Sequence, residues 1–467
     1  MPNPISQPPD PQRKLGPLAS AALLAGTVIG TGIFLVPAIM ARETGSVWLV
    51  FAVWVFGALL SLAGALTYAE LGSSLPAAGG EYVFLRRAYG PVWGFLFGWQ
   101  QITIGKTGSI AGIAVAFSVF LGYFASGLET DIVNVNTPLG AWSINGLQTC
   151  AIAAIFFLTL INCAGVALGG AVQGGLTLIK IAAILALAAL VFRSGHGDWS
   201  HFHQPPPSLA PSSGLDWIGH MGAALAAALW AYDGWNNLTM VGAEIRNPHK
   251  TIPNVLVMGV LGVALVYLLA NLTYFYALPF EAVQNSERVA QDVATVILGP
   301  RGGDALTLAA LISTTAALNG SILSGARVFF AMSRDGLLFS ALSRLHPVHH
   351  TPVSALVLQA MLASTLILVF GHDREALERI LDFALFGMWG FYGITAISVI
   401  VLRRRHPDLP RPYLTLGYPW IPLLFSAVAL MFCASIALRR PWETAFGLGL
   451  LAAGLPVYLW IRWRRRR

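Results

Sequence analysis

The stretch that decides the fold is LLAGTVIGTGIF, Leu23–Phe34. It lies inside an apolar segment long enough to cross a bilayer, which takes about twenty residues. Three of its twelve residues are glycine and two are threonine, although glycine is a poor helix former. Two interpretations are open. Gly26 and Gly30 have the four-residue spacing that lets membrane helices pack closely, or the helix is interrupted here for a functional reason.

The composition is that of an integral membrane protein. Of the 467 residues 56% are hydrophobic and only 10% are charged, with a mean hydropathy of +0.68; soluble domains carry about 25% charged residues. Apolar runs of about twenty residues without period-2 alternation predict helices instead of a barrel. We therefore expect an all-α membrane protein with twelve transmembrane helices. They are predicted near 16–40, 47–73, 93–124, 144–165, 168–194, 215–246, 253–279, 301–333, 351–371, 376–402, 418–438 and 441–461.

Twelve spans place both termini on one side of the membrane. Connections on that side carry about twice as many Lys and Arg residues as those on the other, so both termini are predicted to be cytoplasmic, in a cell membrane. The basic C-terminal tail is typical of a membrane surface and gives no reason to expect nucleic acid binding. Residues 1–15 are Pro-rich and polar, predict a disordered tail and lack the features of a signal peptide.

A second unusual stretch is LWAYDGWNN, Leu229–Asn237, in the sixth span. Asp233 at membrane depth costs several kcal/mol unless it faces a cavity or a partner. Helices 1 and 6 are the first members of two five-helix halves, 16–194 and 215–402, and 403–467 adds two helices and the tail. Interrupted helices at matching positions of two halves are typical of inverted-repeat transporters. This pairing favours the functional interpretation of the first stretch.

Broken helices expose backbone groups that a ligand can use. The half-helix that starts near Thr31 and Gly32 presents free N–H groups and a positive dipole end, which suit a carboxylate. The half-helices that end near Val28 and near Trp230–Asp233 present free carbonyls, which suit an ammonium. Together they predict a site for an α-amino acid.

The sequence resembles a known family at several places. GTVIGTGIF is similar to the first-helix signature of the amino acid–polyamine–organocation (APC) superfamily, and WAYDGWNNLTMVGAEIRNPHKTIP resembles the sixth helix of its L-type amino acid transporter (LAT) branch. ALNGSILSGARVFFAMSRDGLLF and RPYLTLGYPWIPLLF are similar to that branch's eighth helix and 10–11 loop. The resemblance implies a LeuT-like five-plus-five inverted repeat with discontinuous helices 1 and 6. It also implies alternating access and sodium-independent transport of L-amino acids, usually by exchange.

The resemblance also implies roles for individual residues. The amides of Thr31 and Gly32 would hold the substrate carboxylate, and carbonyls of Val28, Trp230 and Asp233 the amine. Trp230 matches the family's aromatic gate, and Tyr274 an aromatic position near the site. The full set of expected substrate-binding residues is Thr27, Val28, Gly30, Thr31, Gly32, Trp230, Asp233, Gly234, Asn236 and Tyr274.

Cysteine usage bears on partners. In animal members of the LAT branch, a cysteine between helices 3 and 4 bonds to a heavy subunit, but residues 122–142 contain none. We therefore expect no disulfide-linked partner and a chain that works alone as a monomer. Cys150, Cys163 and Cys433 have no zinc spacing and are expected to be small buried hydrophobes. No cofactor, metal site or catalytic constellation is expected.

Lys180, in the fifth predicted span, is the strongest intramembrane charge. It could extend to the cytoplasmic interface instead. The resemblance places it where sodium-coupled relatives bind a cation, so its ammonium could bond helix-1 carbonyls and a hydroxyl such as Ser321 or Ser324. It would then replace a sodium ion, or carry a proton if partly desolvated.

Four further charges leave alternatives open. Asp233 could be a counter-charge for a cationic group or a cap of the broken helix. Lys106 is interpreted as a pore-lining or structural charge. Arg327 is expected to extend to the interface, with a gate salt bridge as the alternative, and Glu70 is expected to be an interface charge. Besides amino acid exchange, proton-coupled import and a non-transporting sensor or channel stay open as functions.

Overall fold

The computed structural model describes residues 11–137, 140–203, 214–371, 374–439 and 441–466. Within these ranges ten helices are long and apolar enough to cross a membrane, and a bent pair of shorter helices makes an eleventh span. The one remaining span of the expected twelve is the sixth, 215–246. It appears as α9 (Gly214–Ala231), a turn, and the short α10 (Asn237–Met240). The expected all-α membrane fold with discontinuous helices 1 and 6 is therefore confirmed.

The first half of the chain runs from α1 to α8. The expected third span is interrupted by a π-helical turn at Gln101–Gly105, a feature that often occurs at functional sites. The helices are α1 (Pro17–Val28), α2 (Gly32–Thr44), α3 (Val47–Ser74), α4 (Glu81–Tyr89), α5 (Pro91–Gln100), α6 (Lys106–Gly122), α7 (Gly146–Cys163) and α8 (Val166–Ser194).

The second half continues from α9 and α10 to α16, and two more helices follow. Short helices α12 (Phe280–Asn285) and α13 (Val289–Leu298) precede the longest helix, α14 (Pro300–Arg334). The remaining helices are α11 (Pro248–Ala277), α15 (Val353–Phe370), α16 (Arg374–Arg405), α17 (Trp420–Arg439) and α18 (Pro441–Arg466).

Local sequence explains several helix starts. Pro17, Pro91, Pro248 and Pro300 each occupy the first turn of a helix, where the missing N–H costs nothing and φ is already helical. Helix α7 starts with a capping box, in which Asn145 and Gln148 exchange hydrogen bonds of 2.9 and 2.8 Å.

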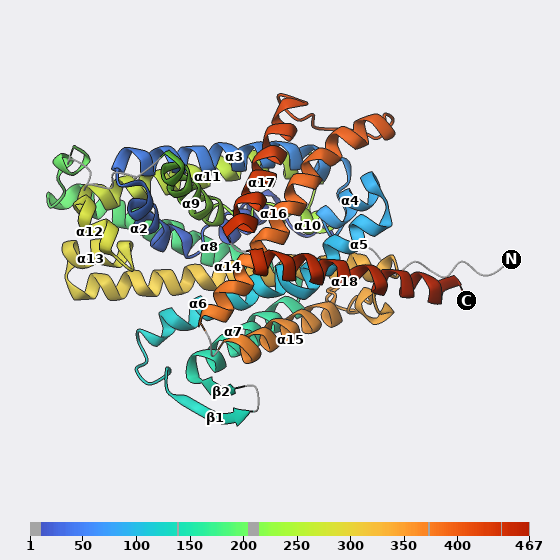
Figure 1. Cartoon of the computed structure of the whole chain (residues 1–467), viewed down its shortest axis with the longest axis horizontal. Coiled ribbons are helices and arrows are strands. Elements are labelled where there is room, and N and C mark those ends of the chain that lie inside the picture. The colour runs from blue at the N-terminus through green and yellow to red at the C-terminus, as the bar shows by residue number, and fades with distance from the viewer. Residues whose placement is uncertain (1–10, 138–139, 204–213, 372–373, 440, 467) are drawn as a thin grey trace.

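An antiparallel hairpin of β1 (Asp131–Thr137) and β2 (Gly140–Asn145) joins α6 to α7 and was not expected from the sequence. Alternation over six or seven residues is a weak signal beside the long apolar runs that flank it. The hairpin lies at the edge of the bundle beside α7 and α15 (Figure 1). It leaves the all-α assignment of the spans unchanged.

The helices pack as a bundle with α14 through its middle (Figure 1). Helices α3 and α11 run along one edge, α7 and α15 along the opposite edge, and α14 packs against α6 and α8 between them. Helix α1 packs against both α8 and α14. This arrangement surrounds the breaks of the first and sixth spans with α6, α8, α11, α14 and α16.

Candidate functional site

The first break separates α1 from α2 at Ile29–Thr31, with a bend of 40°. The N–H of Gly30 turns back to the carbonyl of Val28 at 2.8 Å. No acceptor is found in the described chain for the N–H groups of Thr31, Gly32 and Ile33. Three donors without an acceptor thus stand at the start of a 13-residue helix, the position at which a helix dipole favours an anion.

The glycines of the first stretch serve different purposes. A Cβ on Gly26 would lie 1.9 Å from the side chain of Gln173 and 2.4 Å from that of Thr177, so α1 and α8 can pack only around a glycine there. A Cβ on Gly30 would meet nothing closer than 3.8 Å. Close packing therefore explains Gly26, whereas Gly30 lies in the break itself.

The second break separates α9 from α10 at 232–236. Gly234 has φ +106°, a conformation that side chains other than glycine rarely adopt. The carbonyl of Trp230 accepts from the N–H of Asp233 at 3.2 Å, and no donor is found for the carbonyl of Asp233 in the described chain. Trp230 is 42% exposed, although Ala231 and Tyr232, which follow it, are buried.

Hydrogen bonds hold the two breaks together. Thr27 Oγ1 in α1 donates to the carbonyl of Gly234 at 3.0 Å. The hydroxyl of Tyr267 in α11 lies 2.9 Å from the carbonyl oxygens of both Val28 and Ala231, so one proton serves an acceptor from each break. The side chains of Thr27 and Tyr267 thus join segments about 200 positions apart in the sequence, 207 for the contact between Thr27 and Gly234.

The resemblance named Tyr274, but the tyrosine of α11 that contacts both breaks is Tyr267. Tyr274 lies on the same helix two turns further along, and its buried hydroxyl has no hydrogen-bond partner among the described residues. The seven-residue spacing places both rings on one face of α11. The spacing could therefore identify this face of α11 from the sequence. It could not distinguish Tyr267 from Tyr274, because only their contacts differ.

Lys180 of α8 is fully buried, and its Nζ donates to the carbonyls of Gly26, at 2.8 Å, and Ile29. Extension to the interface is thus excluded. The hydroxyl at this place is Ser313 of α14, which donates to the carbonyls of Ile29 and Gly30 at 3.1 and 3.2 Å.

The choice of Ser321 and Ser324 as hydroxyls beside Lys180 is corrected. Ser324 Oγ donates within its own helix, to the carbonyls of Gly320 and Ser321 at 2.8 and 3.3 Å. Both serines lie two to three turns beyond Ser313, about 12 Å or more along the helix axis. The sequence offered several serines on α14 and no way to fix the depth at which α8 crosses it.

A buried polar cluster surrounds the second break. Asp233 accepts from the hydroxyl of Tyr392 in α16 at 3.0 Å and interacts with the N–H of Gly234. Lys106, at the start of α6 after the π-helical turn, donates to Asn237 at 2.6 Å. The amide of Asn236 donates to Glu81. These contacts of the Asp233 carboxylate agree with both roles left open by the sequence, a helix cap and a charge beside the site.

Two expectations for other charges are wrong. Arg327 and Glu244 are each 1% exposed and form a two-pronged ion pair at 3.0 and 3.1 Å, so Arg327 does not extend to the interface. Glu70 is buried, binds Arg403 at 2.6 and 2.8 Å and accepts the N–H of Thr415. Both carboxylates, Glu244 and Glu70, have partners far away in the sequence. Considering each predicted helix by itself does not reveal such partners.

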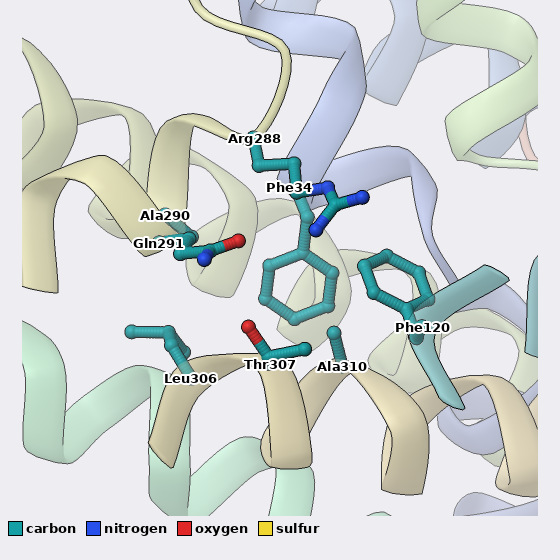
Figure 2. A pocket seen from close by; sticks show the side chains of 8 residues that line it. All are labelled: Phe34, Phe120, Arg288, Ala290, Gln291, Leu306, Thr307 and Ala310. Atoms are coloured by element: carbon teal, nitrogen blue, oxygen red, sulfur yellow. The ribbon is translucent and has the colours of Figure 1, made fainter. Parts of the chain in front are cut away.

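A small pocket lies beyond the first break, between α2, α13, α14 and the end of α6. The ring of Phe34 stands between Phe120 and Thr307, with Arg288 above it (Figure 2). Its volume of about 10 Å³ holds no more than one water molecule. The pocket is therefore too small for an amino acid in this conformation.

Two unwound segments held face to face inside a helical bundle define a helical secondary transporter. The comparison with known families agrees. The amino acid permease family matches residues 15–444, and the chain belongs to this family.

The relatives are amino acid transporters. The serine/threonine exchanger SteT of Bacillus subtilis (strain 168) is 31% identical over 97% of this chain and 98% of its own length. The b(0,+)-type amino acid transporter 1 of Mus musculus is 31% identical over 96% and 87% of the two chains. The human cystine/glutamate transporter is 30% identical over 97% and 86%. The inferred resemblance to LAT-type transporters is thereby confirmed.

Proposed function

We propose that this chain is a sodium-independent exchanger of L-amino acids that works by alternating access. The observation that carries the proposal is that N–H groups without an acceptor at the start of α2 lie beside a second break whose Asp233 carbonyl has no donor in the described chain. The two ends of a zwitterion need these two kinds of group. Relatives that are exchangers by name, including SteT, support the choice of exchange.

In this proposal the substrate carboxylate is held by the amides of Thr31 and Gly32. The amine is held by the carbonyl of Asp233, for which the described chain offers no other donor. The carbonyl of Val28 already receives the N–H of Gly30 and the hydroxyl of Tyr267, so it joins the site only if one of these moves. Thr27, Gly234 and Asn236 position the second break, and Trp230 covers the substrate.

Lys180 explains sodium independence in this proposal. A sodium ion bound to broken-helix carbonyls neutralises their dipoles and fixes the break. The ammonium of Lys180 does the same for Gly26 and Ile29, with Ser313 as a second donor. Because the cation is part of the chain, no sodium gradient drives the cycle.

We further propose that the transporter lies in the cell membrane with both termini in the cytoplasm, and that it works as a monomer without a disulfide-linked heavy subunit. The distribution of basic residues supports the orientation. The absence of cysteine from 122–142 supports the second statement. The proposal includes no enzymatic role.

Proteoliposomes test the proposed function. Vesicles loaded with unlabelled serine should take up labelled serine, whereas empty vesicles should not, with or without sodium. Uptake into empty vesicles under a pH gradient would instead show proton-driven import. Binding without flux would indicate a sensor. Competition by each of the twenty amino acids then defines the substrate range.

A further inference from the structure

Glu81 is a buried carboxylate that the substrate site does not use. It is the first residue of α4, outside the membrane-spanning helices, and its exposed fraction is 0%. Its Oε1 accepts from the amide Nδ2 of Asn236. Its Oε2 and the Oδ1 of Asn236 have no partner in the described chain. Two groups in contact thus carry two unpaired acceptors, which is costly in a buried place.

One proton would satisfy both unpaired acceptors. A neutral carboxyl group has an O–H donor, and the amide oxygen of Asn236 is the acceptor it lacks. A carboxylic acid and an amide can form two hydrogen bonds with each other, one in each direction. Protonation also removes a buried charge.

We propose that Glu81 is a proton-binding site whose proton holds α4 against the second break in the conformation of this structure, here called closed because Glu81 is fully buried in it. The proton binds and leaves without any other bond being made or broken. In the ionised form, Glu81 is stabilised by water, so loss of the proton favours the conformation in which this side of the molecule opens.

The titratable groups around Glu81 come from four other elements. They are Tyr68 of α3, Lys106 of α6, Asp233 of the second break and Tyr392 of α16. Burial raises the pKa of Glu81 to about 7. Asn236, the backbone N–H of Glu81 itself and Lys106 oppose this rise, and Asp233 acts in the same direction as burial. The proton would therefore exchange within the physiological range.

The backbone connects the segment before Glu81 to α10, the second half of the broken sixth span. The N–H of Gly79 donates to the carbonyl of Met240 at 2.9 Å, and Ala78 pairs with Val241 in an antiparallel bridge. The segment before α4 is therefore joined to α10 and the residue after it. Water can reach Glu81 only if these neighbours or the second break separate, so protonation and opening are linked.

This inference deepens the proposed function, but its first test does not depend on transport. Infrared difference spectra of the purified protein between pH 6 and pH 8 should contain a protonated carboxyl band with a midpoint near 7. The band should be absent in Glu81→Gln and present in Glu287→Gln, a matched change of an exposed glutamate. A wild-type band that persists in Glu81→Gln would overturn the inference.

The second test measures exchange in proteoliposomes. Wild-type exchange of serine should rise at least about threefold from pH 6 to pH 8, which corresponds to about half a pKa unit between closed and open states. Glu81→Gln, whose amide can donate to Asn236, should be active and independent of pH. An identical pH profile in both proteins would overturn the inference, whereas no exchange at any pH would contradict only the proposed function.

If Glu81→Gln does not fold, Glu81→Asp gives the same decision. Its shorter side chain changes the contact with Asn236, so the midpoint of the carboxyl band should move. An unchanged midpoint would assign the proton to another group.

Discussion

The two breaks differ in what stabilises them. At the first break a fixed ammonium, Lys180, and the hydroxyl of Ser313 saturate the carbonyls, and N–H groups are left free. At the second break the side chains of Asp233 and Asn236 contact a hydroxyl and a carboxyl group of other helices, and a carbonyl has no donor in the described chain. One break therefore supplies donors and the other acceptors, and each can be disturbed separately.

The largest effect is expected from Lys180→Ala. It removes a donor from the buried carbonyls of Gly26 and Ile29. Ile29 keeps the hydroxyl of Ser313, so the carbonyl of Gly26 is the one left unmet, and an unmet buried acceptor costs about 1–3 kcal/mol. This loss predicts a fall in exchange of up to about 100-fold, from the conversion of about 1.4 kcal/mol per factor of ten. Exchange in proteoliposomes measures it, with the melting temperature as a control for folding. Exchange at the wild-type rate would remove Lys180 from the mechanism.

Asp233→Asn tests whether the second break recognises charge. If the carboxylate is a counter-charge, cationic substrates such as arginine should lose about tenfold more affinity than leucine, because hydrogen bonds to charged groups contribute about 1.5–3 kcal/mol. Competition against labelled serine measures both. Tyr392→Phe, which removes the hydroxyl that contacts Asp233, is the matched control for position. Equal losses for arginine and leucine would favour the helix-capping role.

Sequence alone predicted the features that depend on composition and local pattern. Helix spans, the two breaks and the buried Lys180 were all accessible, since hydropathy, glycine placement and membrane charges act locally. The partners of Arg327 and Glu70 were not, because they lie 83 and 333 positions away. Choosing Ser313 over Ser321 required the crossing depth of α8 and α14, and Glu81 required knowing that α4 begins beside the second break, where Asn236 contacts it. Each of these contacts depends on how helices that are distant in the sequence pack against one another.

Tyr267→Phe should have a smaller effect that falls on both breaks at once. The hydroxyl contacts carbonyls of Val28 and Ala231, and a hydrogen bond of this kind contributes about 0.5–1.5 kcal/mol. We expect about a three- to tenfold loss of exchange for all substrates. Tyr274→Phe, on the same face of α11 and without a hydroxyl partner, is the matched control and should retain full rate. The reverse result would return the role to Tyr274.

Thr27→Val should have the smallest effect. It tests the hydrogen bond that joins the two breaks directly. Thr27 Oγ1 donates across to Gly234 at 3.0 Å, but it also lies 2.9 and 3.0 Å from the carbonyls of Leu23 and Leu24 in its own helix. Because one proton serves three acceptors, removing it costs about 1 kcal/mol, or about fivefold in affinity. Thr27→Ser keeps the hydroxyl and should bind serine as the wild type does. If Thr27→Ser and Thr27→Val lose affinity equally, the methyl group of Thr27 matters and the hydrogen bond does not. The two breaks would then be held together by Tyr267 and by packing, and a substrate could separate them at lower cost than the present contacts suggest.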